Sequence, residues 1–263
     1  RHSRHACRAL GETEMSPALE TRNLCKSFGA LVVAENISFR LEVGARHALI
    51  GPNGAGKTTF VNMLTGLLAP SSGQVLLGGE DITHLAQEAR VKRGIGRTFQ
   101  INTLFRDMSV LDNVALGVAE RHGVAARPWR SANSHREVRD ESFGLLETLG
   151  LSQDAGKRIV DLPYGKQRLV EIAIALGLKP RVLLLDEPAA GVPSLESGMI
   201  LRVLDRLPGE IAVLIIEHDM DVVFRFAQCI TVLVEGRVLC EGAPEEIASD
   251  PRVRQVYLGE QHG

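Results

Sequence analysis

The 263-residue sequence has little that suits a membrane span, a nucleic-acid surface or a secretory signal. No apolar run approaches the roughly 18 residues that a spanning helix requires. The formal net charge is −2 at pH 7, so no excess of positive charge favours a DNA or RNA partner. The start of the chain lacks a positive, then apolar, then small-residue order. These absences favour a cytoplasmic protein that reaches a membrane only through a partner.

Cysteine is also scarce, and the four residues are Cys7, Cys25, Cys229 and Cys240. None of them stands in C-x-x-C spacing. We therefore expect ordinary thiols in a reducing compartment, and neither bridges nor metal ligands.

What the sequence does contain is a glycine-rich run that fits the pattern G-x-x-x-x-G-K-[ST]. It consists of Gly51, Pro52, Asn53, Gly54, Ala55, Gly56, Lys57, Thr58 and Thr59. Glycines let successive backbone N–H groups face one anion, and the positive end of an expected helix at 57–68 points to the same place. The pattern predicts a nucleoside triphosphate, with Lys57 reaching the β- and γ-phosphates and Thr58 placing its hydroxyl on Mg²⁺. The alternative is a glycine-rich turn that merely joins a strand to a helix.

A second element with acidic residues fits the same chemistry. The apolar run 182–185 predicts a strand buried on both faces of a parallel sheet, with Asp186 and Glu187 at its C-terminal end. Side chains alternate along a strand, so the two carboxylates point to opposite sides. We assign Asp186 to the metal and Glu187 to the attacking water as general base. Solvated carboxylates at a strand end are the alternative.

Three further motifs carry a family resemblance. They are Gly96-Arg97-Thr98-Phe99-Gln100, Leu162-Pro163-Tyr164-Gly165-Lys166-Gln167-Arg168 and Ile216-Glu217-His218-Asp219. With the glycine loop and the acidic strand, their order resembles that of ABC-transporter ATP-binding subunits, over about residues 19–259. Segments 97–110, 186–191 and 244–260 resemble the branched-chain amino-acid (LivG-like) type more narrowly.

The resemblance implies roles for three more residues. Gln100 would sense the metal shell and the attacking water from a mobile loop, and His218 would orient water and a phosphate oxygen beyond a second buried strand at 211–216. Phe28 would stack on the adenine of ATP. Taken singly, these residues also fit an ordinary loop glutamine, a strand-end histidine and a small-sheet core phenylalanine.

The signature motif departs from the usual Leu-Ser-Gly-Gly-Gln. It reads Leu162, Pro163, Tyr164, Gly165, Lys166 and Gln167. Pro163 has neither a hydroxyl nor a backbone N–H, so one contact to the γ-phosphate of ATP on the opposite subunit should be missing. Gly165 and an expected helix at 167–178 keep the positive helix end, and Lys166 adds a cation. Pro193 stands where the resembling loop usually carries Asn or Asp, which suggests asymmetric catalysis in a pair of unlike ATPases.

The expected fold class is α/β, a P-loop NTPase core with a mostly parallel sheet, a small antiparallel β subdomain and a helical subdomain. We expect a disordered leader at 1–15 and an ABC nucleotide-binding domain at 16–259. Within it, the catalytic core covers about 16–99 and 179–243, the helical lobe 100–178, and a C-terminal tail 244–263. Alternation at 18–43 and 74–82 predicts the antiparallel sheet. The Arg- and His-rich segment 119–141 is either a permease contact or a solvated loop.

The resemblance implies a cytoplasmic ATPase on the inner face of the plasma membrane, with ATP and Mg²⁺ as cofactors. Its partners would be permease subunits, a second ATP-binding subunit in a homo- or heterodimer and, indirectly, an external solute-binding protein. Leu104 and Phe105 would offer apolar surface to a permease helix, unless they belong to the core of the lobe. The leading function is ATP hydrolysis that drives import of branched-chain or related amino acids. The alternatives are a non-transport or regulatory ABC ATPase and a lipid or lipopolysaccharide exporter ATPase.

Overall fold

The computed structural model describes residues 16–98, 104–124 and 132–258, and the chain divides into two compact units. The first unit comprises residues 1–90 and 209–263, and the second comprises residues 91–208. The leader expected at 1–15 lies outside the described residues. The second unit contains the helical lobe expected at 100–178 together with strands before and after it.

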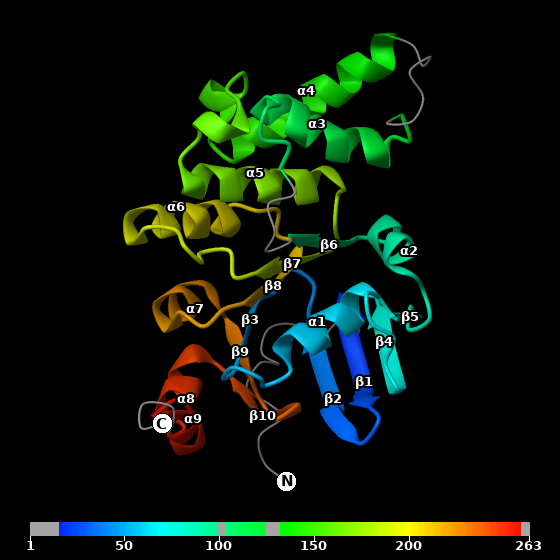
Figure 1. The fold of residues 1–263 in the computed structure, drawn as a ribbon, viewed down its shortest axis with the longest axis vertical. Helices are drawn as coiled ribbons and strands as arrows, with labels where there is room; N and C mark the ends of the chain where they lie inside the picture. The colour runs from blue at the N-terminus through cyan, green and yellow to red at the C-terminus, as the bar shows by residue number, and fades with distance from the viewer. Residues whose placement is uncertain (1–15, 99–103, 125–131, 259–263) are drawn as a thin grey trace. The chain divides into compact units, whose positions relative to one another are not determined.

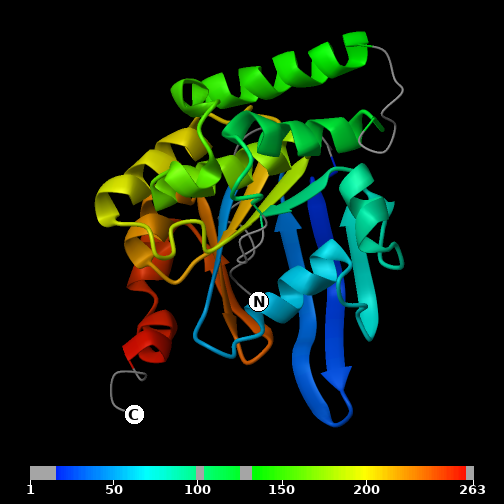
Figure 2. The same ribbon diagram turned by 45° about the horizontal axis from the view of Figure 1, so that its top comes forward.

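An antiparallel sheet forms the N-terminal part of the first unit (Figure 2). Its strands, in the order β2-β1-β4-β5, are β1 (Leu19–Phe28), β2 (Leu31–Leu41), β4 (Ser72–Leu77) and β5 (Glu80–Asp81). Leu19 of the central strand pairs with Leu41 on one side and Leu77 on the other, and all three are buried. Alternation along these strands therefore places one apolar face in the core, which confirms the antiparallel sheet that the sequence predicts.

Parallel strands form the centre of the first unit. They are β3 (Arg46–Ile50), β8 (Ala212–Ile216) and β9 (Cys229–Val234), with β10 (Arg237–Gly242) antiparallel to β9. Ala48 of β3 pairs with Ile215 of β8 and with Ile230 of β9, so β3 lies between the two. Every residue of β3 and β8 is buried, as strands covered on both faces require. This confirms the mostly parallel sheet of a P-loop NTPase core.

The helices of the first unit are α1 (Lys57–Thr65), α7 (Met220–Phe226), α8 (Pro244–Ser249) and α9 (Pro251–Leu258). Phe60 of α1 meets Phe39 of β2 edge to face, with ring centroids 5.6 Å apart, and this contact fixes α1 against the small sheet. The helix ends three residues before the expected position 68. Gly66 follows it with φ 80°, a left-handed conformation that terminates a helix.

The second unit combines two parallel strands with a set of helices (Figure 1). Its elements are β6 (Ile95–Thr98), α3 (Val110–Arg121), α4 (Ala132–Thr148), η1 (Ser152–Asp154), η2 (Ile159–Asp161), α5 (Tyr164–Gly177), β7 (Val182–Asp186) and α6 (Ser194–Asp205). Helix α2 (Gln87–Lys92) spans the boundary between the units. Figure 1 shows α3, α4 and α5 lying over one another, and this packing confirms the helical subdomain.

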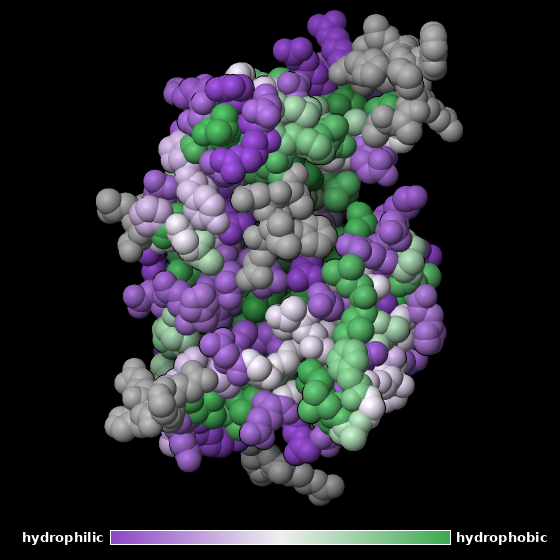
Figure 3. Space-filling view, viewed as in Figure 1, coloured by the Kyte–Doolittle hydropathy of each residue, from purple (hydrophilic) through white to green (hydrophobic). Residues whose placement is uncertain are grey.

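Apolar side chains at the surface of the first unit gather at the β1–β2 hairpin. Phe28, Leu31 and Val32 are each more than half exposed. In Figure 3, apolar residues come to the surface over the region of α1 and the small sheet. Within the described ranges, no helix combines the length and the apolar character needed to cross a membrane.

The cysteines differ from one another. Cys25 and Cys240 are free, and burial raises the pKa of the Cys240 thiol to about 11. Cys229 is only 8% exposed. Cys7 lies outside the described residues, so the expectation of four ordinary thiols stays a prediction.

Candidate nucleotide site

The glycine-rich run joins β3 to α1 in the first unit. The buried strand β3 ends at Ile50, and the next six residues form the loop that leads into α1 at Lys57. Because the residue before the helix is Gly56, no side chain caps the first turn. The first backbone N–H groups of a helix have no partner within the helix, and the helix dipole favours negative charge in front of them, so the start of α1 suits an anion.

Two glycines make the tight path of this loop possible. Gly56 has φ 95°, and a Cβ atom at this position would lie 2.8 Å from the carbonyl oxygen of Val33 on β2. A Cβ atom at Gly51 would lie 2.1 Å from the carbonyl oxygen of Leu233 on β9. The loop is thus held between the small sheet and the parallel strands, at distances that only glycine permits.

The side chain of Lys57 folds back over the loop. Its ammonium Nζ donates hydrogen bonds to the carbonyl oxygens of Gly51 at 2.5 Å and Pro52 at 2.9 Å. Asn53, Gly54 and Thr58 are exposed along the same segment. A lysine ammonium beside a glycine-rich loop at the start of a helix is the arrangement that binds phosphate oxygens, so the loop fits a nucleoside triphosphate.

Phe28 lies at the end of β1 in the same unit and is 51% exposed. This exposure rules out the alternative of a core phenylalanine. Lys26 Nζ lies 5.0 Å from the centre of its ring and donates a hydrogen bond to the carbonyl oxygen of Ala69 at 2.7 Å. An open aromatic face is suited to stacking against a purine.

His218 follows β8, as the sequence predicts, and is exposed. Its backbone N–H donates a 3.3 Å hydrogen bond to a carboxylate oxygen of Glu217, which is only 1% exposed. Asp219 then caps α7 by accepting from the backbone N–H groups of Asp221 and Val222. These local bonds fix the backbone of the turn that carries the histidine.

Asp186 and Glu187 lie at the end of β7 in the second unit, and β7 is buried throughout. Asp186 Oδ2 accepts a hydrogen bond of 2.9 Å from Arg97 on the neighbouring strand β6. Glu187 adopts φ 47°, which is unusual for a residue with a side chain. A left-handed turn at that position redirects the chain directly after the strand, and such conformations concentrate at functional sites.

The signature segment begins α5, three residues earlier than the expected start at 167. Pro163 precedes the helix with φ −56° and provides no side-chain hydrogen bond to it. The ring of Tyr164 is close to Gly191, in the loop after β7, since a Cβ atom there would lie 3.5 Å from the ring. Arg168 donates a 2.6 Å hydrogen bond to the Tyr164 hydroxyl. The structure thus brings the signature and the acidic loop together within the second unit.

Two carboxylates contact the signature, and the signature motif alone does not indicate either of them. Glu196 of α6 accepts a 3.0 Å hydrogen bond from the backbone N–H of Gly165. Asp154, which is 2% exposed, pairs with Lys166 at 2.5 Å and with Lys157 at 2.7 Å. Hydrogen bonds from Lys157 and Lys166 hold the pKa of Asp154 below its ordinary value. The charge of Lys166, expected to be available to a ligand, is balanced inside its own unit.

The donor set also suits Mg²⁺, although it forms no dedicated metal cage. In the described part of the chain, no group of three or more His, Cys, Asp or Glu side chains is placed to hold an ion. Mg²⁺ in phosphate sites takes one or two protein oxygens and fills the rest of its octahedral shell with phosphate and water. The exposed Thr58 hydroxyl of the first unit is an oxygen donor of this kind, and so is the Asp186 carboxylate of the second unit, while Gln100 lies outside the described residues.

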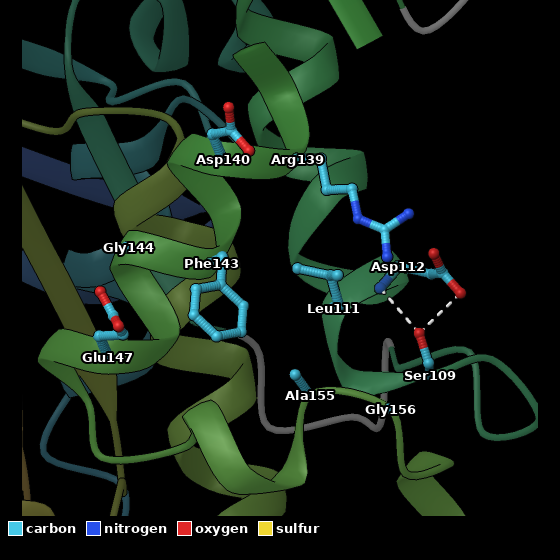
Figure 4. Close-up of a pocket in the computed structure, with 10 residues that line it drawn as sticks. All are labelled: Ser109, Leu111, Asp112, Arg139, Asp140, Phe143, Gly144, Glu147, Ala155 and Gly156. Carbon is cyan, nitrogen blue, oxygen red and sulfur yellow. Dashed lines mark hydrogen bonds between the residues drawn. The ribbon is translucent and has the colours of Figure 1, made fainter. Parts of the chain in front are cut away.

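A separate cavity of about 740 Å³ lies in the second unit (Figure 4). It is lined by Ser109, Leu111, Asp112, Arg139, Asp140, Phe143, Gly144, Glu147, Ala155 and Gly156. Figure 4 shows Phe143 of α4 and Leu111 of α3 on opposite sides of it. None of these residues belongs to the nucleotide site predicted above.

Two families match the chain. The family described as ABC transporter matches residues 34–190. The family described as branched-chain amino acid ATP-binding cassette transporter matches residues 237–263. The first match covers the glycine loop, the signature and the acidic strand, and the second covers β10 and the C-terminal helices.

Several relatives are similar over nearly their whole length. The high-affinity branched-chain amino acid transport ATP-binding protein BraF of Pseudomonas aeruginosa is 37% identical over 253 residues, which cover 93% of this chain and 98% of the relative. LivG of Escherichia coli K12, which carries the same description, is 37% identical over 257 residues with the same coverage. The lipopolysaccharide export system ATP-binding protein LptB of Acidithiobacillus ferridurans is 38% identical over 248 residues, covering 94% of this chain and 99% of the relative.

Solved structures show the same fold. The ADP conformation of an ATP-binding cassette of an ABC transporter has a TM-score of 0.81 and 31% identity, covering 92% of this chain and 99% of that chain. A dimeric structure of a bacterial ABC transporter cassette has a TM-score of 0.71 and 25% identity, covering 86% of this chain and 98% of that chain.

Proposed function

Since the chain belongs to the ABC transporter family of ATP-hydrolysing cassettes, we propose that it couples ATP hydrolysis to the import of branched-chain or related amino acids. The match of residues 237–263 to the branched-chain amino acid type supports this cargo class. So does the similarity to BraF and LivG along almost the entire chain.

The geometry of the glycine loop is the main observation that supports ATP binding in this proposal. Gly51 and Gly56 allow backbone contacts that no other residue permits, α1 begins directly behind them, and Lys57 folds over the loop. This loop would bind the phosphates of ATP through backbone N–H groups of residues 51–59 and through Lys57. Phe28 would bind the adenine.

The remaining site residues act on the terminal phosphate. Thr58, Asp186 and Gln100 would hold Mg²⁺, which when bound neutralises charge on the β- and γ-phosphate oxygens. Glu187 would take the proton from the attacking water, and its left-handed backbone conformation, with φ 47°, lies directly after β7. His218 would orient the water and the leaving phosphate from its position beyond β8.

Subunits of this kind work with permease components and pair with a second ATP-binding subunit. We infer a head-to-tail pair in which each ATP lies between the glycine loop of one chain and the signature of the other. Pro163 removes one contact from that signature, which favours an unlike second ATPase. An external solute-binding protein would complete the importer, with this subunit on the inner face of the plasma membrane.

Phe105 is the better candidate for contact with the permease. It is 57% exposed, whereas Leu104 is only 6% exposed and belongs to the core. An exposed aromatic residue beside the glutamine loop would fit an apolar residue of a cytoplasmic permease helix. Of the segment 119–141, residues 125–131 lie outside the described residues.

The test uses the complex that co-purifies with this chain from membranes, with each bound subunit identified. We expect permease subunits and a second ATPase in the complex, and ATP hydrolysis that falls about 100-fold or more when Glu187→Gln is introduced while ATP binding persists. Equal and negligible rates for both forms would favour a regulatory subunit with little catalysis of its own.

A lipopolysaccharide exporter is the second candidate, because LptB is as similar to this chain as LivG is. The same purification separates the two functions. Importer permeases together with amino-acid-stimulated hydrolysis would support import, and export permeases would support the second candidate.

A further inference from the structure

The side chain of Glu196 contacts the N-terminus of α5, the helix that begins in the signature. It lies in the first turn of α6, and its Oε2 atom accepts a hydrogen bond of 3.0 Å from the backbone N–H of Gly165 in the first turn of α5. Both helices belong to the second unit and pack against each other. A helix that follows the acidic strand therefore contacts the start of the signature helix directly.

The contact is close enough to depend on the glycine. A Cβ atom at residue 165 would lie 2.5 Å from Glu196 Oε2 and 3.1 Å from Glu196 Cβ. The side chain of Glu196 thus lies against the backbone of Gly165, where any larger residue would displace it.

In this contact a carboxylate, that of Glu196, lies at the N-terminus of a helix, α5. The first N–H groups of a helix have no partner within the helix, and the helix dipole favours negative charge in front of them. A serine before the helix would supply an oxygen, but Pro163 provides no side-chain bond there. The carboxylate of Glu196 fills that role from a neighbouring helix.

The ammonium of Lys166, next to Gly165 in the signature, is also paired with a carboxylate. The ammonium of Lys166 contacts Asp154 at 2.5 Å, and Asp154 is almost completely buried. The two groups that would attract the terminal phosphate of an opposing ATP are the Gly165 N–H and the Lys166 ammonium. Each contacts a carboxylate of its own unit.

We propose that Glu196 is a positioning residue of the signature. From its place on α6, its carboxylate accepts the hydrogen bond of the Gly165 N–H. It must move aside when the terminal phosphate of ATP on the opposing chain binds the same N–H. This inference rests on the proposed function, since it needs ATP bound across a pair of chains. The negative charge of Glu196 opposes the incoming phosphate. The hydrogen bond also links the signature to α6, the helix that follows Glu187 in the chain. When ATP on one chain binds the signature of the other chain, the change at Gly165 is therefore transmitted to the acidic loop of that second chain.

The test measures the ATP concentration at half-maximal hydrolysis, and the maximal rate, for the complex purified from membranes. Glu196→Gln keeps an oxygen that accepts from Gly165 but removes the charge, and Glu196→Ala removes both. Removing one charge from a helix terminus should lower the half-saturating ATP concentration about threefold in both variants. Glu196→Asp keeps the charge and should remain within twofold of the wild type. Glu210→Gln, at an exposed position of the first unit, is the matched control and should also match the wild type.

A purely structural cap predicts a different pattern. In that case Glu196→Ala lowers the melting temperature, and both Glu196→Gln and Glu196→Ala leave the half-saturating ATP concentration unchanged or raise it, which overturns the inference. Glu196→Gln retains the hydrogen-bond acceptor, so the measurement remains possible even where the alanine variant does not fold. A wild-type complex without Glu187-dependent hydrolysis would refute the proposed function. Normal hydrolysis with unchanged half-saturation in both variants would refute only the role of Glu196.

Discussion

Arg97 donates a hydrogen bond of 2.9 Å to Oδ2 of Asp186, and each side chain is only 10% exposed. The two residues occupy neighbouring parallel strands, where Arg97 pairs with Leu184 and so lies two positions before Asp186 in register. A cation from β6 therefore stabilises the carboxylate that we assign to Mg²⁺, in the same unit and at the same sheet edge. Because the pair is nearly buried, loss of one partner leaves the other without its counter-charge.

Replacement of Arg97 should destabilise the protein strongly. We expect Arg97→Ala to reduce the free energy of unfolding by about 3 kcal/mol, since it leaves Asp186 charged and buried. Urea unfolding followed by circular dichroism measures this change. Arg158→Ala is the control, because it removes an ion pair to Asp161 in which both side chains are at least half exposed. Little change is expected there, and equal losses in the two variants would contradict the importance of burial.

Gly56→Ala should distort the phosphate loop. The substitution places a Cβ atom against the carbonyl of Val33 in a residue with φ 95°, at a cost of about 1–3 kcal/mol, and ATP binding should weaken at least tenfold. Gly144→Ala in α4 is the matched control, because no atom lies within 4 Å of its added Cβ. That variant should gain about 0.5–1 kcal/mol from helix propensity and bind ATP normally. Thermal unfolding and ATP titration of both variants check the contrast.

Pro163→Ser should restore a hydroxyl to the signature. Serine favours the position before a helix, and its oxygen would reach both the first turn of α5 and a phosphate from the opposing chain. We expect the ATPase rate of the purified complex to rise severalfold. Pro163→Ala also removes the proline ring but adds no hydroxyl, so it should not raise the rate. An equal increase in both variants would trace the effect to chain flexibility instead.

Stability at acid pH should depend on Glu141. Burial alone would raise the pKa of this carboxyl, but hydrogen bonds from His122, Lys179 and Arg121 together lower it to about 2. A depressed pKa stabilises the folded state above the ordinary value near 4.5, and this contribution is lost as the pH falls toward 2. After allowance for solvent screening we expect a contribution of about 1 kcal/mol.

Glu141→Gln provides the measurement. The variant should be less stable than the wild type at pH 6, and the difference should shrink steadily between pH 4.5 and pH 2.5. Glu147→Gln, at an exposed position on the same helix, is the matched control. A difference for Glu141→Gln that does not vary with pH would contradict the assigned pKa.

The main elements of the fold could be predicted from the sequence because their signals are local. Apolar runs at 48–50, 182–185 and 211–216 mark β3, β7 and β8, which are buried on both faces. Alternation marks the antiparallel sheet. The ends of helices were less certain, since α1 stops at Gly66 through its left-handed backbone and α5 starts directly after Pro163.

The contacts that set the electrostatics of the site could not be predicted, because they join distant positions. Arg97 and Asp186 are separated by 89 residues, and Gly165 and Glu196 by 31. Lys166 reads as a free cation in its motif, yet Asp154 lies against it after the fold forms. The motifs themselves do not indicate these partners. A carboxylate three residues into the helix after an acidic strand is the only signal that could have drawn attention to Glu196.

Titration of the wild-type chain with ATP and Mg²⁺, beside the Lys57→Ala variant, tests the central claim most directly. The account predicts saturable binding of ATP by the wild type, with affinity reduced at least tenfold when the ammonium over the glycine loop is removed. No saturable binding by the wild type, or equal affinity in the two chains, would contradict it.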